Sequence, residues 1–201
     1  MIEVRGRNVS ALLNPRPVVL VTTCGKDGIP NVLSVTWTTP VSHEPPILAL
    51  SIAPIRHSHW LLNETGECVV NVVGQQLMDA VELCGKASGS RANKFAAAGL
   101  KTTGSVYVQP PRIDGALACL ECRVIRSLIA GDHSLFIAQV LVAEADDRAF
   151  SDVWNTEAGD VLLCRQRDRF GICQKVPAQG NVRLSVNACA NQKERLGNRS
   201  R

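Results

Sequence analysis

Small hydroxyl and amide side chains lie among apolar residues in the stretch from residue 31 to residue 63. Residues 31–37 and 47–52 are short apolar segments that favour strands. The polar side chains within and just after them belong to Asn31, Ser34, Thr36, Ser51 and Ser58. This mixture suits a pocket in which a flat, partly polar ligand lies against strands. The stretch therefore predicts a ligand site.

A short helix is predicted over residues 59–64, with Ser58 as its N-cap and Gly66 at its exit. A helix N-terminus offers free N–H groups and the positive end of a dipole, so an anionic group can bind there. Arg56 adds a fixed positive charge. Capping alone would also explain Ser58, and the two roles can coexist. His57 and His59 are interpreted as solvated.

Other site chemistries have little support in the sequence. The chain has eight cysteines, mostly inside apolar segments, which indicates core or strand cysteines rather than disulfides. Cys119 and Cys122 form a lone CxxC in a predicted strand, where their odd spacing sends the side chains to opposite faces. No second CxxC or histidine cluster completes a metal site, so no metal is predicted.

Composition indicates one soluble globular domain. The chain has 201 residues, of which 45% are hydrophobic and 20% charged. No apolar run approaches a membrane span, and the N-terminal residues lack a signal-peptide layout, so we expect a cytoplasmic protein. Residues 178–201 hold the whole excess charge of +4 and are predicted to form a flexible tail after a domain of residues 1–177. Nucleic acid is not expected as a partner, because the tail has no aromatic interleaving.

Short strands dominate the predicted secondary structure. Strands are expected at 17–23, 31–37, 47–52, 67–73, 117–127 and 134–145, with Asp27-Gly28 as a hairpin turn and Pro40 breaking regular structure. Helices are expected at 77–84 and 93–98, the second ended by Gly99. A short element is expected at 150–154. This pattern predicts a small antiparallel barrel with a few short peripheral helices.

Eight short motifs occur in an order that resembles one known family. They are 15–23 (PRPVVLVTT), 28–34 (GIPNVLS), 45–47 (PPI), 66–71 (GECVVN), 93–100 (NKFAAAGL), 110–113 (PPRI), 120–122 (LEC) and 131–133 (GDH). Together they resemble the flavin reductase-like family with the FMN-binding split barrel, which includes flavoredoxins. The resemblance implies a mainly β, Greek-key-like split β-barrel that forms a homodimer. It also implies FMN as the cofactor, with FAD as a possibility, and either NAD(P)H-driven flavin reduction or electron transfer.

The resemblance also assigns residues to the flavin. The strand with Asn31, Val32, Ser34, Thr36 and Trp37 and the segment Ser51, Ile52, Ala53 would contact the ring system, although core packing is favoured for Trp37 itself. Arg56 and Ser58 would hold the phosphate. The loop with Ala87, Ser88 and Gly89 would approach the phosphate or ribityl chain, or is an ordinary loop. Lys94 would neutralise the phosphate or face water.

His133 belongs to the Gly-Asp-His motif, which in similar reductases places its histidine near the flavin or nicotinamide. Phe170 stands where the family often has a tyrosine. The first hypothesis is an NAD(P)H-dependent flavin reductase that passes electrons on, to an electron-acceptor protein or a monooxygenase. The cofactor carries this chemistry, which fits the lack of a hydrolytic residue set. The alternatives are a flavoredoxin-like electron-transfer protein and a non-enzymatic flavin-binding module.

Overall fold

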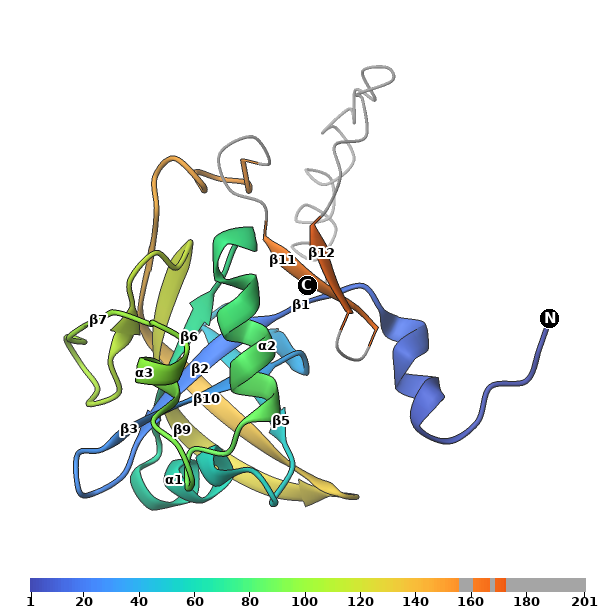
Figure 1. Cartoon of the computed structure of the whole chain (residues 1–201), viewed down its shortest axis with the longest axis horizontal. Helices are drawn as coiled ribbons and strands as arrows, with labels where there is room; N and C mark the ends of the chain where they lie inside the picture. Colours follow the sequence, from blue (N-terminus) through green and yellow to red (C-terminus); the bar gives the residue numbers. More distant parts are fainter. Residues whose placement is uncertain (156–160, 167–168, 173–201) are drawn as a thin grey trace, which may run out of the picture.

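The computed structural model describes residues 1–155, 161–166 and 169–172, and a seven-stranded antiparallel sheet dominates it (Figure 1). The order across this sheet is β3-β2-β6-β9-β10-β5-β4. Its strands are β2 (Val19–Cys24), β3 (Pro30–Val35), β4 (Thr38–Ser42), β5 (Ile47–Ile52), β6 (Glu67–Val72), β9 (Ala118–Ala130) and β10 (His133–Ala145). The mainly β, antiparallel architecture confirms the predicted fold class.

Smaller elements surround this sheet. Strands β1 (Arg16–Pro17), β11 (Leu162–Gln166) and β12 (Arg169–Ile172) form a three-stranded sheet, and β7 (Thr102–Thr103) pairs with β8 (Arg112–Ile113). The helices are short: η1 (Gly6–Leu13), α1 (His57–Thr65), η2 (Gln75–Leu77), α2 (Met78–Lys86) and α3 (Lys94–Ala97). Figure 1 shows η1 reaching away from the main sheet, beyond the sheet of β1, β11 and β12.

Apolar side chains fill both faces of the sheet around β2. Successive residues of a strand point to opposite faces, and all six residues of β2 are buried. On one face, Val19 and Val21 join a cluster with Leu33, Leu50 and Phe136, to which strands from both halves of the sheet contribute. This shared interior indicates that the sheet curls round one core, as in a barrel.

The opposite face of β2 and β3 is covered by helices. Leu20 and Val32 pack there with Val81 and Cys84 of α2 and with Phe95 of α3. Phe170 packs against the same cluster. Helix α2 is therefore held directly against β3, which carries the predicted ring contacts Asn31, Val32 and Ser34.

The turn between β2 and β3 confirms the predicted hairpin. Gly28 has a φ of +78°, a value that glycine adopts readily. The Asp27 carboxylate accepts a hydrogen bond from the backbone N–H of Ile29 at 2.9 Å. Strand β3 ends at Val35, two residues before the predicted end, so Trp37 lies in the connection to β4.

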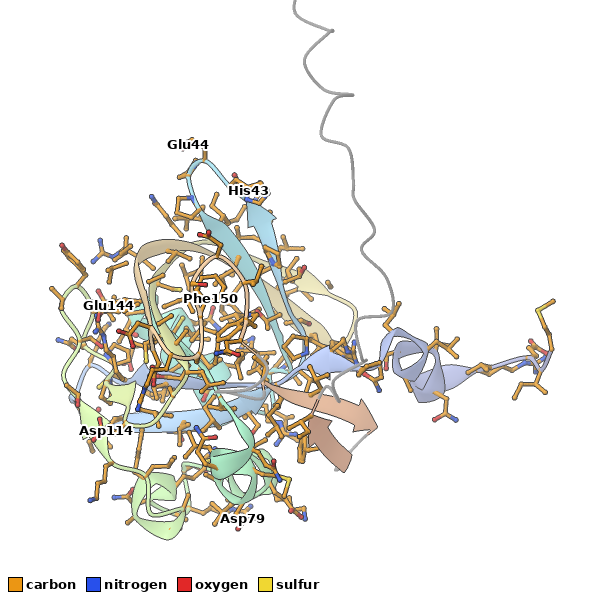
Figure 2. The ribbon with its side chains drawn as sticks, turned by 90° about the horizontal axis from the view of Figure 1, so that it is seen from above. His43, Glu44, Asp79, Asp114, Glu144 and Phe150 are labelled. Carbon is orange, nitrogen blue, oxygen red and sulfur yellow. The ribbon has the colours of Figure 1, made fainter. Side chains whose placement is uncertain are left out.

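Pro40 does not break regular structure, and that prediction was wrong. It lies inside β4, opposite Leu48 of β5. Strand β4 is at the edge of the sheet, where a missing backbone N–H costs no ladder hydrogen bond. Figure 2 shows the β4–β5 hairpin projecting, with His43 and Glu44 at its tip.

Strands β9 and β10 form the long hairpin that the sequence predicted. Gly131, with a φ of +65°, makes the turn, and β10 lies centrally between β9 and β5. The odd spacing of the CxxC has the expected result: Cys122 joins the core, while the Cys119 thiol contacts Asn71 Oδ1 at 3.3 Å. The element expected at residues 150–154 is an isolated bridge between Phe150 and Trp154.

The expected division at residue 177 lies outside the described residues and stays a prediction. Within the described part of the chain, none of the helices is long and apolar enough to cross a membrane. In that same part, no group of three or more His, Cys, Asp or Glu side chains could hold a metal ion.

Candidate functional site

Ser58 does not cap helix α1, contrary to the prediction. The helix begins at His57, its N-cap is Arg56, and Arg56 makes no side-chain cap hydrogen bond. Ser58 lies in the first turn and points inward, where its Oγ accepts hydrogen bonds from Asn31 Nδ2 at 2.6 Å and Thr23 Oγ1 at 3.5 Å. Both contacts use the oxygen as acceptor, so the hydroxyl proton is available to a further group.

The loop after α2 lies against this helix start. A Cβ atom placed on Gly89 would be 2.0 Å from Asn31 Oδ1 and 3.2 Å from His57 Cδ2, so no other residue fits there without a shift. Asn31 thus touches Ser58 on one side and the Gly89 backbone on the other. The structure therefore brings three predicted residues, Asn31, Ser58 and Gly89, together at the N-terminus of α1.

Two cations converge on the last turn of α2, beside the same loop. Lys94 Nζ donates to the Cys84 carbonyl at 3.2 Å, and Arg56 Nη1 donates to the Gly85 carbonyl at 3.0 Å. The Ser34 hydroxyl also donates to this helix, at the Val81 carbonyl. Three residues predicted from separate motifs therefore share α2 as their support.

Lys94 is enclosed, with 3% of its surface exposed. Burial lowers its pKa, the Cys84 thiol opposes this shift, and the nearby positive Arg56 adds to it. Among the described residues, no carboxylate forms an ion pair with Lys94 or Arg56. The C-terminus of α2 supplies about half an elementary negative charge, which offsets only part of two positive charges. The region keeps an excess of positive charge.

A second group of predicted residues gathers where β10 begins. The His133 ring lies 4.7 Å from the Trp37 ring, with 31° between their planes. Trp37 is 37% exposed, so the expectation that it fills the core was wrong. Arg16 lies in β1 of the small sheet, and its guanidinium carbon is 5.7 Å from the centre of the Trp37 ring, within cation–π range.

His133 is also held by its neighbour. Its Nδ1 lies 2.7 Å from Asp132 Oδ1, so Nδ1–H donates to the carboxylate and Nε2 is left for another partner. Ser51 joins the same region, because its backbone N–H donates to the Trp37 carbonyl at 2.9 Å. Trp37, Ser51 and His133 are thus neighbours in space, as a shared ring site requires.

The remaining predicted residues have other surroundings. The side chains of Val32 and Ile52 lie in the two core clusters, which leaves their backbone for a ligand. The Ala53 carbonyl accepts from the Arg56 N–H at 3.0 Å and so starts the turn into α1. Ser88 is exposed and bonds to Ser90, while Thr36 and Ala87 are half-buried.

One histidine that the sequence interpretation set aside occupies a specific position. His59 Nε2 lies 2.8 Å from Ser134 Oγ, and Asn63 Nδ2 lies 3.2 Å from His59 Nδ1. The spacing of four residues between His59 and Asn63 on a predicted helix was the available signal. Nothing in the sequence pointed to Ser134 as the partner, because the two residues are 75 positions apart.

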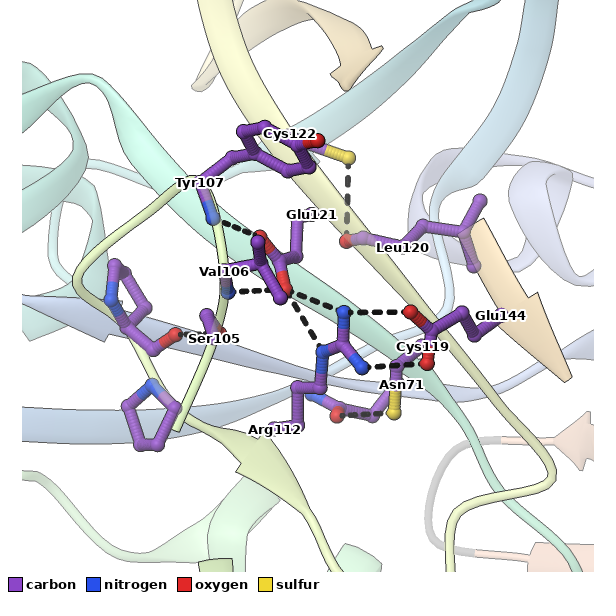
Figure 3. A network of polar contacts seen from close by, with 12 residues as sticks. Asn71, Ser105, Val106, Tyr107, Arg112, Cys119, Leu120, Glu121, Cys122 and Glu144 are labelled. Carbon is purple, nitrogen blue, oxygen red and sulfur yellow. Dashed lines mark hydrogen bonds and ion pairs between the residues drawn. The ribbon is translucent and has the colours of Figure 1, made fainter. Parts of the chain in front are cut away.

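A further polar cluster lies around Arg112 (Figure 3). The Arg112 side chain bonds to Glu121 at 2.7 Å and to Glu144 at 2.7 Å. Glu121 is fully buried and also accepts from the backbone N–H groups of Val106 and Tyr107. An open pocket adjoins this cluster, lined in part by Arg112, Cys119 and Glu144.

Comparison with known proteins places these features in a family. The model of the flavin reductase like domain matches residues 12–170. The chain belongs to this family. Its relatives include an uncharacterized protein of Archaeoglobus fulgidus, which is 37% identical over 123 residues, 61% of this chain and 69% of the relative.

Two solved structures show the fold of this family member. Flavoredoxin of Desulfovibrio vulgaris superposes with a TM-score of 0.77 at 20% identity, over 90% of this chain and 98% of the flavoredoxin. A putative flavin reductase with a split barrel domain from Shewanella frigidimarina gives a TM-score of 0.76 at 17% identity, over 88% and 93% of the two chains. The predicted family and the split-barrel fold are thereby confirmed.

Proposed function

We propose that this family member binds FMN and reduces it with NAD(P)H, and that the reduced flavin passes electrons to a further acceptor. FAD is the alternative flavin, and an electron-acceptor protein or a monooxygenase is the kind of partner expected. The observation that carries the proposal is the enclosed Lys94, which lies near the positive charge of Arg56. Neither side chain forms an ion pair with a carboxylate of the described residues. Two cations beside a helix start are suited to a phosphate.

The residues at the start of α1 fit the phosphate of a flavin nucleotide. The first turn has no side-chain cap, and the His59 N–H donates to the Arg56 carbonyl, so the N–H groups before His59 can donate to an anion. The Ser58 hydroxyl proton can do the same. Lys94 and Arg56 supply the charge. The close approach of Gly89 keeps the loop backbone near this point.

The residues at the start of β10 fit the ring end. Trp37 offers a partly exposed aromatic surface, and Ser51 and Ala53 offer backbone groups on an ordered strand end. A bound flavin would supply the hydride acceptor and the electron carrier. His133, fixed by Asp132 and packed on Trp37, would orient a nicotinamide and keep water from the ring. No proton transfer by His133 is needed.

The visible spectrum of the purified protein tests this function directly. Added FMN should bind with a shifted absorbance band, and NADH or NADPH should then bleach that band under anaerobic conditions. Bleaching by dithionite but by neither nicotinamide would favour a flavoredoxin-like electron carrier. A protein indifferent to flavin would instead indicate a module without redox activity.

Replacing His133 with alanine should slow flavin reduction by NAD(P)H about tenfold or more, because misplacing a reactant by about 1 Å has effects of this size. Flavin affinity should remain largely intact, and dithionite should still reduce the variant fully. Stopped-flow absorbance measures the rate. His43→Ala, at the exposed hairpin tip, is the matched control. An unchanged hydride-transfer rate would remove His133 from the proposed site.

We also propose a homodimer. Strand β9 exposes the apolar side chains of Ile125, Leu128 and Ile129, at 54%, 40% and 84%. A two-fold contact would bury these side chains. Sedimentation at micromolar concentration should give twice the chain mass, and Ile129→Lys should shift the protein toward monomer. Val153→Lys, at another exposed apolar residue, should not. A monomeric unmutated protein would contradict this proposal.

A further inference from the structure

His59 connects the two parts of the candidate site. It lies in the first turn of α1, beside Ser58, and its Nε2 is 2.8 Å from the hydroxyl of Ser134 on β10. Ser134 follows His133 directly and pairs in the sheet with Ile52. A side chain at the phosphate end of the site thus contacts the strand that carries the ring-end histidine.

The contacts of the His59 ring define its tautomer. Asn63 Nδ2 donates to the His59 backbone carbonyl at 3.0 Å and lies 3.2 Å from His59 Nδ1. An amide nitrogen donates, so Nδ1 is the acceptor and carries no proton. The proton is therefore on Nε2, and Nε2–H donates to Ser134 Oγ. The His59 ring also packs edge-on against buried Phe136, with 5.2 Å between ring centres.

These contacts connect α1 back to β10, the strand that pairs with β5. From Ile52 the chain leaves β5, turns at Ala53 through Arg56, and enters α1, where His59 reaches back to the partner of Ile52 on β10. The turn is therefore fixed at both of its ends. The His59 contact adds a directional hydrogen bond between α1 and β10 to the apolar packing of Leu62 with Phe136.

We infer that His59 is a positioning residue, which sets the separation between the phosphate-binding helix start and the ring-binding start of β10. The inference rests on the proposed function. A flavin mononucleotide must meet both ends at once, whereas riboflavin needs the ring end alone. His59 therefore matters more for FMN than for riboflavin.

The test compares flavin affinities of designed variants. His59→Leu should weaken FMN binding about three- to tenfold, the effect of one lost hydrogen bond, and riboflavin binding less. His59→Gln keeps an N–H donor near the Nε2 position and should restore most of the FMN affinity. Ser134→Ala removes the acceptor with a smaller change, and should reproduce His59→Leu without adding to it in the double variant. His43→Gln is the control histidine variant.

A second readout does not need flavin. Nitrogen-15 NMR of the unliganded protein should show His59 as the Nε2–H tautomer, and Ser134→Ala should alter its signals. Burial lowers the pKa of His59, and its ring partners Asn63, Ser134 and Phe136 are uncharged. Protonation below about pH 6.5 would add a proton at Nδ1 and leave the Nε2–H donor to Ser134 in place. The Nε2–H signal and the contact with Ser134 should therefore persist on acidification.

The outcomes separate this inference from the proposed function. If the unmutated protein binds FMN and His59→Leu binds it equally well, the positioning role is overturned and flavin binding stands. Equal loss of FMN and riboflavin, or no rescue by His59→Gln, would also overturn it. An unmutated protein that binds no flavin would overturn the proposed function, and this inference with it.

Discussion

Replacing Arg112 with methionine is expected to lower the free energy of unfolding by about 3–5 kcal/mol, the usual cost of leaving a buried charge unpaired. Glu121 is fully buried, and the Arg112 side chain is 14% exposed (Figure 3). The backbone N–H groups of Val106 and Tyr107 still bond to Glu121 in the variant, so the lower end of the range is favoured. Urea unfolding followed by circular dichroism measures the loss.

Two further variants separate this effect from general damage. Arg123→Met removes an exposed ion pair with Glu67, whose N–O distance is 3.4 Å, and should change stability by less than about 1 kcal/mol. Adding Glu121→Gln to Arg112→Met should recover part of the loss, because no charge is then left buried. A loss in Arg112→Met no larger than in Arg123→Met would contradict this account.

The pH dependence of the Arg112 variant has a definite sign. Burial opposes ionisation of Glu121, but hydrogen bonds from Val106, Tyr107 and Arg112 outweigh it and hold its pKa below the ordinary 4.5. The stabilisation by Glu121 is thus present above about pH 4.5 and is lost as pH falls through the lower folded-state pKa. The stability difference between the two proteins should therefore shrink at low pH.

The double replacement Arg56→Met and Lys94→Met is expected to weaken FMN binding about 10²- to 10⁴-fold and riboflavin binding little. Each charge-assisted hydrogen bond to the phosphate contributes about 1.5–3 kcal/mol, and a factor of ten corresponds to about 1.4 kcal/mol. Methionine fills much of the volume of the enclosed Lys94 side chain. Quenching of flavin fluorescence on titration gives both dissociation constants.

The control for this experiment is Lys101→Met, because Lys101 is an exposed lysine outside the site. It should leave both affinities unchanged. If the double variant weakens FMN and riboflavin equally, the phosphate binds elsewhere. If it weakens neither, Lys94 and Arg56 only stabilise α2, as cations at its C-terminus.

Local patterns were sufficient where one residue type has one physical role. Asp27-Gly28 predicted the β2–β3 hairpin, because the turn needs a residue that tolerates positive φ. The spacing of Cys119 and Cys122 placed them on opposite faces, since strand side chains alternate. The ordered motifs predicted the family, which the match over residues 12–170 confirms.

Patterns failed where neighbours in space decide the outcome. Pro40 indicates a break in any strand, but an edge strand leaves its missing N–H without consequence, and edge position is a property of the whole sheet. Ser58 is a residue type that often caps helices, yet its oxygen points inward and accepts a hydrogen bond from Asn31 of β3. Trp37 is a large aromatic residue of a type often found in cores, but it lies after the end of β3, beside His133.

The sequence by itself determined the main strands of the sheet and its turns, because these depend on periodicity and on backbone preferences of single residues. Tertiary structure decided which side chains meet. Lys94 and Arg56 converge on α2 from different segments, and His59 finds Ser134 across 75 positions. The burial of the Glu121 carboxylate is another such case, because a strand's alternation does not reveal that Arg112 and a loop cover that face. Such contacts depend on how distant elements pack, and no local pattern records them.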